Sequence, residues 1–394
     1  MTIKVLHPIT RLIIGGAQEN TMLTAHLLDK AVWDVAIVSG PQTGSEGSLI
    51  ETVREQGIPL ILEPTLVREI NPIKDLLAVI RLAWLMRRGH YTIVHTHSSK
   101  AGILGRWAAK LAGVPVIVHT VHGWGHHERQ HPLVRAYYIS LEKLTLPITD
   151  KLIVVAALNI DKGLQDGIGQ RDDYLVIRSG IELDRFGHPQ VSRAATRAAW
   201  KIPPDAPLIG TVTRLSPQKA PLDFVQAAAI IIRRYPDTYF MMVGDGPLHG
   251  DVQKLASELG IADRLILTGL RRDVPELLAA FDLFALSSIW EGLPRVLPQA
   301  MATSLPIVAT ACDGSAEAIE EGVNGFLVAP GEPAALAERL CQLLAQPALA
   351  QQMGAAGYVR AEEFSDQGMV KAIDALYRAL LAAKGITLAP YSDS

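Results

Sequence analysis

The sequence predicts an α/β protein of two doubly wound domains, and three observations lead to this prediction. The chain has 394 residues, 49% of them hydrophobic, which is enough to bury two cores of ordinary domain size. Short apolar runs rich in β-branched residues alternate with segments of helical period, a pattern typical of a parallel sheet covered by helices. The alternation restarts after about residue 186, so the two halves of the chain have a similar organisation.

The first half contains six runs that we expect to form buried strands. They occupy residues 3–7, 35–39, 59–63, 92–97, 114–120 and 151–156. Helical segments lie between them, for example at 20–30 and at 100–113, where Gly113 and Pro115 supply a stop signal. Residues 1–186 are therefore predicted to form an N-terminal domain around a parallel sheet.

The second half repeats the pattern with five runs. These occupy residues 208–213, 238–244, 264–269, 282–287 and 306–311. Residues 187–363 are predicted to form the second domain, and the connection between the domains is expected at 187–207, where Pro, Gly, Arg and Asp are mixed. A helix is expected at about 364–384, after the second sheet is complete, and is predicted to pack back on the first domain.

Composition argues against several classes of function. With 37 Lys plus Arg against 40 Asp plus Glu, the formal net charge of −3 makes nucleic acid an unexpected partner. Two cysteines are too few for a disulfide framework and fit a reducing compartment, so the cytoplasm is the expected location. The first residues read as a strand rather than a signal peptide, and no apolar stretch approaches the roughly 20 residues of a spanning helix. A soluble or peripheral protein is expected.

Loops that follow predicted strands carry candidate ligand-binding residues, because ligands of open parallel sheets bind beyond the carboxyl ends of the strands. Gly15 and Gly16 let backbone N–H groups at a helix start approach a phosphate, although two glycines equally suit an ordinary tight turn. Arg214 and Lys219 can converge on a diphosphate, with a solvated surface pair as the alternative. No dinucleotide fingerprint or P-loop motif is present, so hydride transfer and P-loop hydrolysis lose support.

Another such loop contains Glu291 and Gly292, before a helix that we expect Pro294 to open. N–H groups near Gly292 and Leu293 would face an anion, and the Glu291 carboxylate would accept hydrogen bonds from hydroxyl groups. A simple helix cap is the alternative interpretation. Gln299 is expected about 12 Å further along the same helix.

Histidines are concentrated in the first domain. They are His95, His97, His119, His122, His126, His127 and His131. The H-E-x-x-H motif is absent, and no metal site is predicted. His97 and His122 are expected to face a ligand at the strand ends, and a buried, hydrogen-bonded core histidine is the alternative for each of them.

Taken together, these segments resemble family 4 of the nucleotide-sugar-dependent glycosyltransferases. The stretches that carry the resemblance cover most of the chain and are GGAQ (15–18), HTHSSKAG (95–102), HTVHGW (119–124), IRSGIELDRF (177–186), GTVTRLSPQKAPLDF (210–224), VGDGPL (243–248), residues 267–302 and GSAEAIEEGVNGFLV (314–328). The resemblance implies the GT-B fold, in which two Rossmann-like domains face each other across a cleft. It also implies a retaining hexosyltransferase that uses a nucleotide diphosphate sugar as donor and needs no cofactor or metal ion.

The resemblance further implies roles for individual residues. Catalytic roles fall to Glu291 beside the transferred sugar, His122 approaching the sugar from the first domain, and Arg214 and Lys219 holding the diphosphate in place of a metal ion. Donor contacts are implied at Gly15, Gly16, Leu270, Arg271, Gly292, Leu293 and Gln299. Acceptor contacts are expected at His97, Lys100, Trp124 and His126.

The chain departs from the family pattern at several positions. Gln299 replaces the second glutamate of the E-x7-E element, which accepts hydrogen bonds from the ribose hydroxyls. An amide oxygen still accepts but carries no charge, so donor affinity or nucleotide preference is expected to differ. Ser179 replaces an asparagine, and Ala220 and Asp313 replace glycines.

The acceptor is expected to be a glycan or a lipid-linked molecule of a surface polysaccharide or glycoconjugate pathway. Residues 123–144 have a composition suited to an interfacial helix at the inner face of a membrane, with an ordinary helix with a solvated basic face as the alternative. The residues concerned are Trp124, Arg129, Arg135, Tyr137, Tyr138 and Lys143. No oligomeric state is predicted.

Two other functions stay open at this point. A nucleotide-sugar epimerase of the same fold would use the donor without an acceptor. A non-catalytic nucleotide-sugar binder is suggested by Gln299. The spacing of Arg214 to Lys219 and the presence of Glu291 favour transfer over both.

Overall fold

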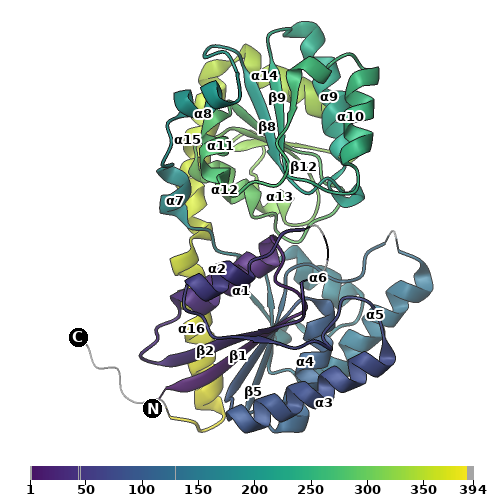
Figure 1. Ribbon diagram of the computed structural model, residues 1–394, viewed down its shortest axis with the longest axis vertical. Coiled ribbons are helices and arrows are strands. Elements are labelled where there is room, and N and C mark those ends of the chain that lie inside the picture. The colour runs from purple at the N-terminus through teal and green to yellow at the C-terminus, as the bar shows by residue number, and fades with distance from the viewer. Residues whose placement is uncertain (1, 43, 45, 129, 388–394) are drawn as a thin grey trace. The chain divides into compact units, whose positions relative to one another are not determined.

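The computed structural model describes residues 2–42, 44, 46–128 and 130–387, and it divides into two compact units. The first unit combines Met1–Gly180 with the C-terminal segment from Asp366, and the second unit spans Ile181–Ser365. In each unit, helices pack against a parallel sheet (Figure 1). The prediction of an α/β protein with two doubly wound halves is confirmed.

The first unit contains a seven-stranded sheet with the order β3-β2-β1-β4-β5-β6-β7. Its strands are β1 (Ile3–Ile9), β2 (Trp33–Ser39), β3 (Leu60–Leu62), β4 (Ile93–His97), β5 (Val116–Val121), β6 (Lys151–Val154) and β7 (Tyr174–Val176). Its longer helices are α1 (Gly16–Leu27), α2 (Ile50–Glu55), α3 (Pro72–Gly89), α4 (Ser99–Ala112), α5 (Pro132–Thr145), α6 (Leu158–Gln165) and α16 (Asp366–Ala383). The strand order reverses between β1 and β4, and the loops after these strands are therefore where a ligand of this sheet is expected.

The second unit contains a six-stranded sheet with the order β10-β9-β8-β11-β12-β13. Its strands are β8 (Leu208–Val212), β9 (Tyr239–Val243), β10 (Leu265–Leu267), β11 (Leu283–Leu286), β12 (Ile307–Thr310) and β13 (Gly325–Val328). Its longer helices are α7 (Leu183–Gly187), α8 (Arg193–Ala199), α9 (Pro221–Arg234), α10 (His249–Glu258), α11 (Val274–Ala280), α12 (Val296–Ala302), α13 (Ser315–Ala318), α14 (Pro333–Ala345) and α15 (Pro347–Ala361). Here the order reverses between β8 and β11.

The C-terminal helix α16 belongs to the first unit, although it follows the second unit in sequence. Met369, Ile373 and Tyr377 of α16 lie in the same buried cluster as residues of β1 and β2. Trp33 Nε1 donates a hydrogen bond of 2.7 Å to Asp374 of this helix, and the Trp33 ring meets Tyr377 edge-on. Residues from the two ends of the chain thus share one core.

The division of the chain differs from the expected boundary at residue 186 and from the connection expected at 187–207. The structure divides at Gly180, α7 comes before most of the expected connection, and the connection itself contains α8 of the second unit. Arg197 of α8 is buried and donates to the carbonyl oxygens of Ala280, Pro203 and Ala206. A polar, proline-containing stretch is therefore held in the second unit by one buried guanidinium rather than serving as a linker.

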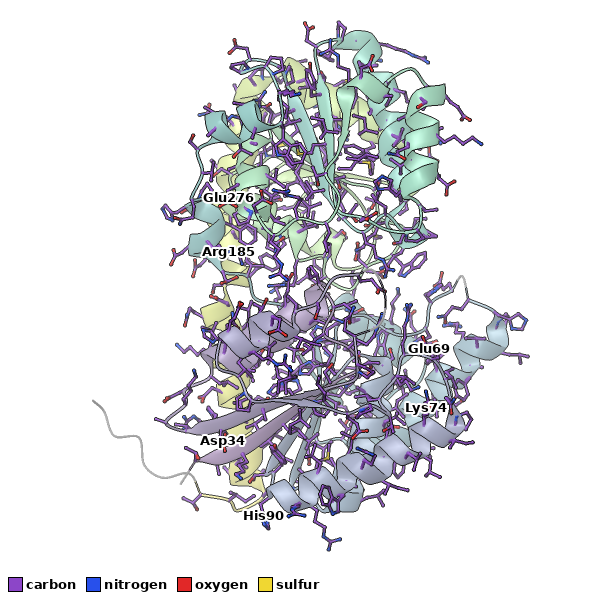
Figure 2. The ribbon with its side chains drawn as sticks, in the orientation of Figure 1. Asp34, Glu69, Lys74, His90, Arg185 and Glu276 are labelled. Carbon is purple, nitrogen blue, oxygen red and sulfur yellow. The ribbon has the colours of Figure 1, made fainter. Side chains whose placement is uncertain are left out.

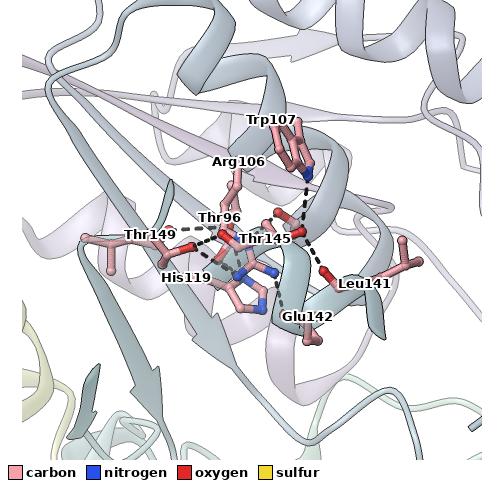
Figure 3. A network of polar contacts seen from close by, with 10 residues as sticks. Thr96, Arg106, Trp107, His119, Leu141, Glu142, Thr145 and Thr149 are labelled. Atoms are coloured by element: carbon pink, nitrogen blue, oxygen red, sulfur yellow. Dashed lines mark hydrogen bonds and ion pairs between the residues drawn. The ribbon is translucent and has the colours of Figure 1, made fainter. Parts of the chain in front are cut away.

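A buried polar network joins α4 to α5 on one side of the first sheet (Figure 3). The Arg106 side chain is fully buried and donates to Glu142 Oε2 at 2.6 Å and to the Gly102 carbonyl at 2.9 Å. His119 of β5 bonds Thr96 of β4 in the same region, at 2.9 Å. Gly102 is required here, because a Cβ at this position would lie 2.5 Å from the His119 ring. The network fixes α4, whose N-terminus follows β4.

Candidate active site

The loop after β8 supplies the two cations that the sequence singles out. Arg214 lies in this loop, and a single 3₁₀ turn, Pro217–Lys219, leads into α9. Ile289 N donates to the Gln218 carbonyl at 2.8 Å, and Gln218 Nε2 donates to the Trp290 carbonyl at 2.9 Å. These two bonds attach the loop after β8 to the loop after β11, the neighbouring strand.

The attachment brings Lys219 and Glu291 together. Lys219 Nζ donates to Glu291 Oε1 in an ion pair whose carboxylate side chain is only 6% exposed. The backbone N–H of Glu291 donates to Asp313 Oδ2 at 2.9 Å, so a residue of the loop after β12 holds the same position. A carboxylate and an ammonium group are thus fixed together at the carboxyl ends of three adjacent strands.

The loop after β12 packs closely against the backbone of Gly292 and Leu293. Gly314 N donates to the Gly292 carbonyl at 2.9 Å, and a Cβ on Gly314 would lie 2.9 Å from Leu293 Cα. Asp313 has φ 40°, a conformation that aspartate tolerates better than most residues. The aspartate that replaces a family glycine therefore adopts a backbone suited to glycine and adds a hydrogen bond to Glu291.

Ala220 has φ 42° at the start of α9, where the family pattern has glycine. The left-handed conformation costs an alanine about 1–2 kcal/mol, partly offset by the greater freedom of glycine in the unfolded chain. We predict that Ala220→Gly raises the free energy of unfolding by up to about 1 kcal/mol, measured by urea unfolding. Ala198→Gly, at an exposed position inside α8, is the matched control and should lower the free energy by a similar amount. Equal effects of the two substitutions would contradict strain at Ala220.

The helix that follows Gly292 begins later than expected. Pro294 does not open it; α12 begins at Val296, and Leu297 N donates to the Pro294 carbonyl. Pro298 is the third helical residue, where its missing N–H is harmless. Gln299 lies half-buried in the helix, with its N–H bonded to the Arg295 carbonyl.

Leu270 and Arg271 lie in the loop after β10. Leu270 is 45% exposed. Arg271 makes two hydrogen bonds to Asp273, at 2.8 and 2.7 Å, and its guanidinium lies over the Trp200 ring. Hydrogen bonding to Asp273 raises the pKa of Arg271. An exposed apolar side chain beside an ordered planar cation can accommodate an aromatic base.

In the first unit, Gly15 and Gly16 lie at the start of α1, after β1. Gly15 is the N-cap, and a Cβ on it would lie 2.9 Å from Gln18 Oε1. Gly16 is the first residue of the twelve-residue helix. The close approach of Gln18 gives Gly15 a steric reason to lack a side chain.

The structure places two of the expected acceptor residues, His97 and His126, in the interior of the first unit. His97 is 1% exposed and bonds His7 at 2.8 Å and His122 at 3.1 Å. His126 is 6% exposed and bonds Asp166 at 2.9 Å. Burial lowers the pKa of His126 although Asp166 opposes the shift. Both imidazoles are thus buried and hydrogen-bonded within the unit.

Trp124 is held by a hydrogen bond from its Nε1 to the Asn159 carbonyl at 2.8 Å, and its ring packs beside Tyr174. Lys100, the remaining candidate, lines a pocket of about 340 Å³ within the first unit. Sequence reasoning missed the other polar residues of this pocket. They include Thr10, Arg11, Gln18, Arg68, Asp75, Ser98 and Ser99. For those that follow β1 and β4, at the point of strand reversal, this position is the signal that could have identified them.

Three positively charged side chains and two carboxylates lie at or near the wall of the pocket. Lys100 pairs with Asp75 at 2.6 Å, and Arg11 and Arg68 approach Glu46 at 3.2 and 3.8 Å. Ser98, at the end of β4, has φ 62° and bonds Thr10 through its hydroxyl at 2.8 Å. A non-glycine residue in this backbone region costs about 1–3 kcal/mol and is found preferentially at functional sites.

His7, His95 and His97 form the one cluster of potential metal ligands found among the described residues. Their ligand atoms lie within 4.8 Å of one another. Each ring nitrogen already has a hydrogen-bonding partner in His122, Tyr377, Thr120 or another ring of the cluster. Hydrogen bonding between neutral rings therefore accounts for this cluster, and we do not assign a metal ion to it.

Comparison with known proteins defines the class. Residues 192–360 match the family described as glycosyl transferases group 1, and residues 15–179 match the glycosyl transferase 4-like domain. The chain is 34% identical over 333 residues to the UDP-Gal:alpha-D-GlcNAc-diphosphoundecaprenol alpha-1,3-galactosyltransferase of Escherichia coli, covering 83% of this chain and 84% of the relative. It is 30% identical over 298 residues to the putative glycosyltransferase EpsD of Bacillus subtilis, covering 74% and 77%.

Among solved structures, Anabaena Alr3699/HepE in complex with UDP and glucose superposes with a TM-score of 0.83 at 21% sequence identity, covering 96% of this chain and all of that one. The fold is therefore GT-B, and the protein is a nucleotide-sugar-dependent glycosyltransferase. The chain belongs to glycosyltransferase family 4, as its sequence motifs predict.

Proposed function

We propose that the protein is a retaining hexosyltransferase that transfers a sugar from a nucleotide diphosphate donor to a lipid-linked acceptor during surface glycan biosynthesis. The Lys219–Glu291 ion pair, with its carboxylate buried, at the carboxyl ends of β8 and β11 carries this proposal. An ammonium group suits the anionic leaving group, and the adjacent carboxylate suits the hydroxyls of the transferred sugar.

The reaction needs stabilisation of the diphosphate as the glycosidic bond breaks. Arg214 and Lys219 provide positive charge to the diphosphate in place of a divalent cation, and the Gly292 and Leu293 backbone contacts sugar and phosphate. Glu291 accepts hydrogen bonds from the sugar, and Leu270 and Arg271 border the base. Gln299 accepts from the ribose without a charge. Gly15, Gly16 and His122 of the first unit contact the donor, as the family resemblance implies.

The acceptor site is proposed to be the pocket lined by Lys100. Its volume of about 340 Å³ suits a small headgroup, and the cations Arg11, Arg68 and Lys100 border it. The related Escherichia coli enzyme is named for an acceptor with a diphosphoundecaprenol group. A lipid diphosphate would exchange the carboxylates that now pair with these cations for phosphate oxygens.

The N-terminal end of the long helix α3 borders this pocket, and α3 has an apolar face directed outward. Ala78, Leu82 and Met86 face the core, whereas a stripe on the opposite side is exposed. The exposed stripe comprises Ile73 (74%), Leu76 (62%), Leu77 (44%), Ile80 (55%) and Trp84 (61%). No helix in the described part of the chain has both the length and the apolar character to cross a bilayer.

The charge of α3 complements an anionic membrane surface. The helix carries Lys74, Arg81, Arg87 and Arg88 against Asp75, which pairs with Lys100. Figure 2 shows Lys74 and Glu69 near one end of α3 and His90 just beyond the other. On α5, Leu133, Val134 and Tyr137 are also exposed, and Tyr137 lines the pocket. Arg129, which belongs to the segment expected to be interfacial, lies outside the described residues. We propose that α3, with α5, seats the enzyme peripherally on the cytoplasmic leaflet.

Replacing two exposed apolar residues of α3 is therefore expected to weaken membrane binding. Ile80→Ser with Trp84→Ser should lower partitioning onto phosphatidylglycerol-containing vesicles at least roughly 10-fold, measured by co-sedimentation. The control is Tyr358→Ser with Val359→Ser, which removes two exposed apolar side chains from α15 of the second unit. Equal binding of both double variants would show that α3 does not contact the membrane.

The assigned activity is tested with the purified protein. A panel of nucleotide sugars is titrated by calorimetry, and each binder is assayed for nucleotide release with and without lipid extract. Release that depends on the acceptor supports transfer and identifies the donor. Donor binding without release under any condition would favour a non-catalytic binder, the function suggested by Gln299, and isomerisation of the donor sugar without acceptor would favour an epimerase.

A further inference from the structure

A continuous chain of hydrogen bonds crosses the interior of the first unit and ends at His122. Thr120 Oγ1 lies 2.6 Å from His95 Nε2, and His95 Nδ1 lies 2.6 Å from Tyr377 Oη. Tyr377 Oη lies 3.4 Å from His7 Nε2. His7 Nδ1 then lies 2.8 Å from His97 Nε2, and His97 Nδ1 lies 3.1 Å from His122 Nε2. The chain joins β5, β4, α16 and β1.

The members between the two ends are electrically neutral. Burial lowers the pKa of His7 to about 3 and lowers the pKa of His95 and His97 well below the ordinary 6.5. Burial also raises the pKa of Tyr377, so the phenol keeps its proton. A neutral imidazole has one N–H donor and one acceptor nitrogen. Within each ring, donation at one nitrogen therefore requires acceptance at the other. Tyr377 passes the direction on, because a buried phenol that accepted from both His95 and His7 would leave its own proton without an acceptor.

Thr120, at the far end of the hydrogen-bond chain, determines the direction of donation. Thr120 is 3% exposed, and among the described residues its hydroxyl has no hydrogen-bonding partner besides His95. If Thr120 accepted from His95, its own proton would be buried without an acceptor. Thr120 is therefore the donor, and the same sense continues from His95 through Tyr377 and His7 to His97.

We infer that this chain is a tautomer relay that holds His122 as the Nδ1–H form, with Nε2 accepting from His97, and that Thr120, His95, Tyr377, His7 and His97 are positioning residues for His122. The relay presents an N–H donor at Nδ1, which suits a sugar hydroxyl or phosphate oxygen and excludes proton abstraction by that nitrogen. Reversal would require every proton of the chain to move together and would leave the Thr120 hydroxyl unpaired. An unpaired buried hydroxyl corresponds to a preference of roughly 5- to 150-fold for the stated direction.

The consequence for donor binding rests on the proposed function, whereas the tautomer itself does not. The tautomer is read in the free enzyme, without donor or acceptor, from the ¹⁵N shifts and two-bond ¹H–¹⁵N correlations of the imidazoles. The His122 signals are assigned with His122→Gln. We expect a single His122 form at pH 7.5 with Nδ1 protonated and Nε2 unprotonated. A His122 protonated on Nε2 would overturn the inference, even in an active enzyme.

The decisive variants change the far end of the relay. Thr120→Val removes the hydroxyl at similar volume, and Thr120→Ser keeps it. In Thr120→Val we expect at least roughly one His122 ring in five to carry its proton on Nε2, the second tautomer. In Thr120→Ser we expect His122 to keep the Nδ1–H form. Tyr377→Phe interrupts the chain at its centre and should produce the same mixture if Thr120→Val does not fold. An unchanged His122 spectrum in a folded Thr120→Val or Tyr377→Phe variant would show that the chain does not control His122.

A donor assay separates positioning from general packing. If His122 donates to the donor sugar, Thr120→Val should raise the donor KM, and Thr120→Ser should restore it. If His122 of the wild-type protein is in the Nδ1–H form but the protein has no transferase activity, the proposed function is refuted and the relay is not.

Discussion

Glu291→Gln is expected to lower kcat/KM for sugar transfer roughly 10²-fold or more while the second unit remains folded. Glutamine keeps the size of the side chain and one acceptor oxygen, but it removes the charge that pairs with Lys219. Hydrogen bonds from sugar hydroxyls to the neutral amide would be weaker, and the Lys219 ammonium, proposed to hold the diphosphate, loses its charged partner. Initial rates with saturating acceptor, together with donor affinity by calorimetry, measure the effect.

Glu320→Gln is the matched control for this experiment. Glu320 also lies in the second unit, but its carboxylate is exposed and pairs with Arg360 at 3.2 Å, away from the loops after β8 and β11. We expect the control to retain wild-type kcat/KM and a wild-type melting temperature within a few degrees. Full activity of Glu291→Gln would remove Glu291 from the site and with it the principal support for the proposed mechanism.

The first unit is expected to lose several kcal/mol of stability between pH 6.5 and pH 5. His7, His95, His97 and His119 are buried, and burial lowers the pKa of each well below 6.5; for His119, Arg106 adds to the effect. Below pH 6.5 the unfolded chain binds protons that the folded unit does not. Stability therefore rises with pH in this window and falls on acidification, by about 1.4 kcal/mol per pH unit for each histidine.

Hydrogen exchange with mass spectrometry at several pH values, corrected for intrinsic exchange, measures the two units separately. The second unit is the internal control, since its two histidines, His188 and His249, are not buried. Carboxylates respond at lower pH. Burial raises the pKa of Glu63, but hydrogen bonds from Thr65 and the charge of Arg81 outweigh it and keep the pKa below 4.5. An equal loss of protection in both units between pH 6.5 and 5 would contradict the prediction.

The positions of most strands could be predicted because buried parallel strands are continuous apolar runs, and their ends predict where ligand-binding loops lie. Applied to the amino-acid sequence alone, that reasoning places Lys219 and Glu291 in loops at the carboxyl ends of strands. It does not predict β7 (Tyr174–Val176), a short edge strand whose apolar run is closely bounded by charged residues, Asp172 and Asp173 before it and Arg178 after it. Nor does it predict that Asp313 supports Glu291, because that contact depends on a left-handed backbone at a position where glycine is usual.

Whether each histidine faces the core or a ligand also could not be predicted from the spacing of the histidines in the sequence. A histidine at a strand end can face a ligand or the core, and the local sequence is the same in both cases. His97 is buried beside the rings of His7 from β1 and His95 from β4, and Tyr377 of α16 bonds both of these rings. Tyr377 lies 282 positions from its partner His95, so no local pattern contains this information.

The return of α16 to the first unit has a consequence for synthesis on the ribosome. Residues 1–180 of the first unit are translated before the second unit, yet Met369, Ile373 and Tyr377 of the same core are translated after it. The second unit has all of its residues available earlier. While the second unit forms, the nascent first unit therefore exposes the apolar surfaces of β1, β2 and α1 that α16 later covers, and a chain truncated before residue 366 leaves these surfaces exposed to chaperones and proteases.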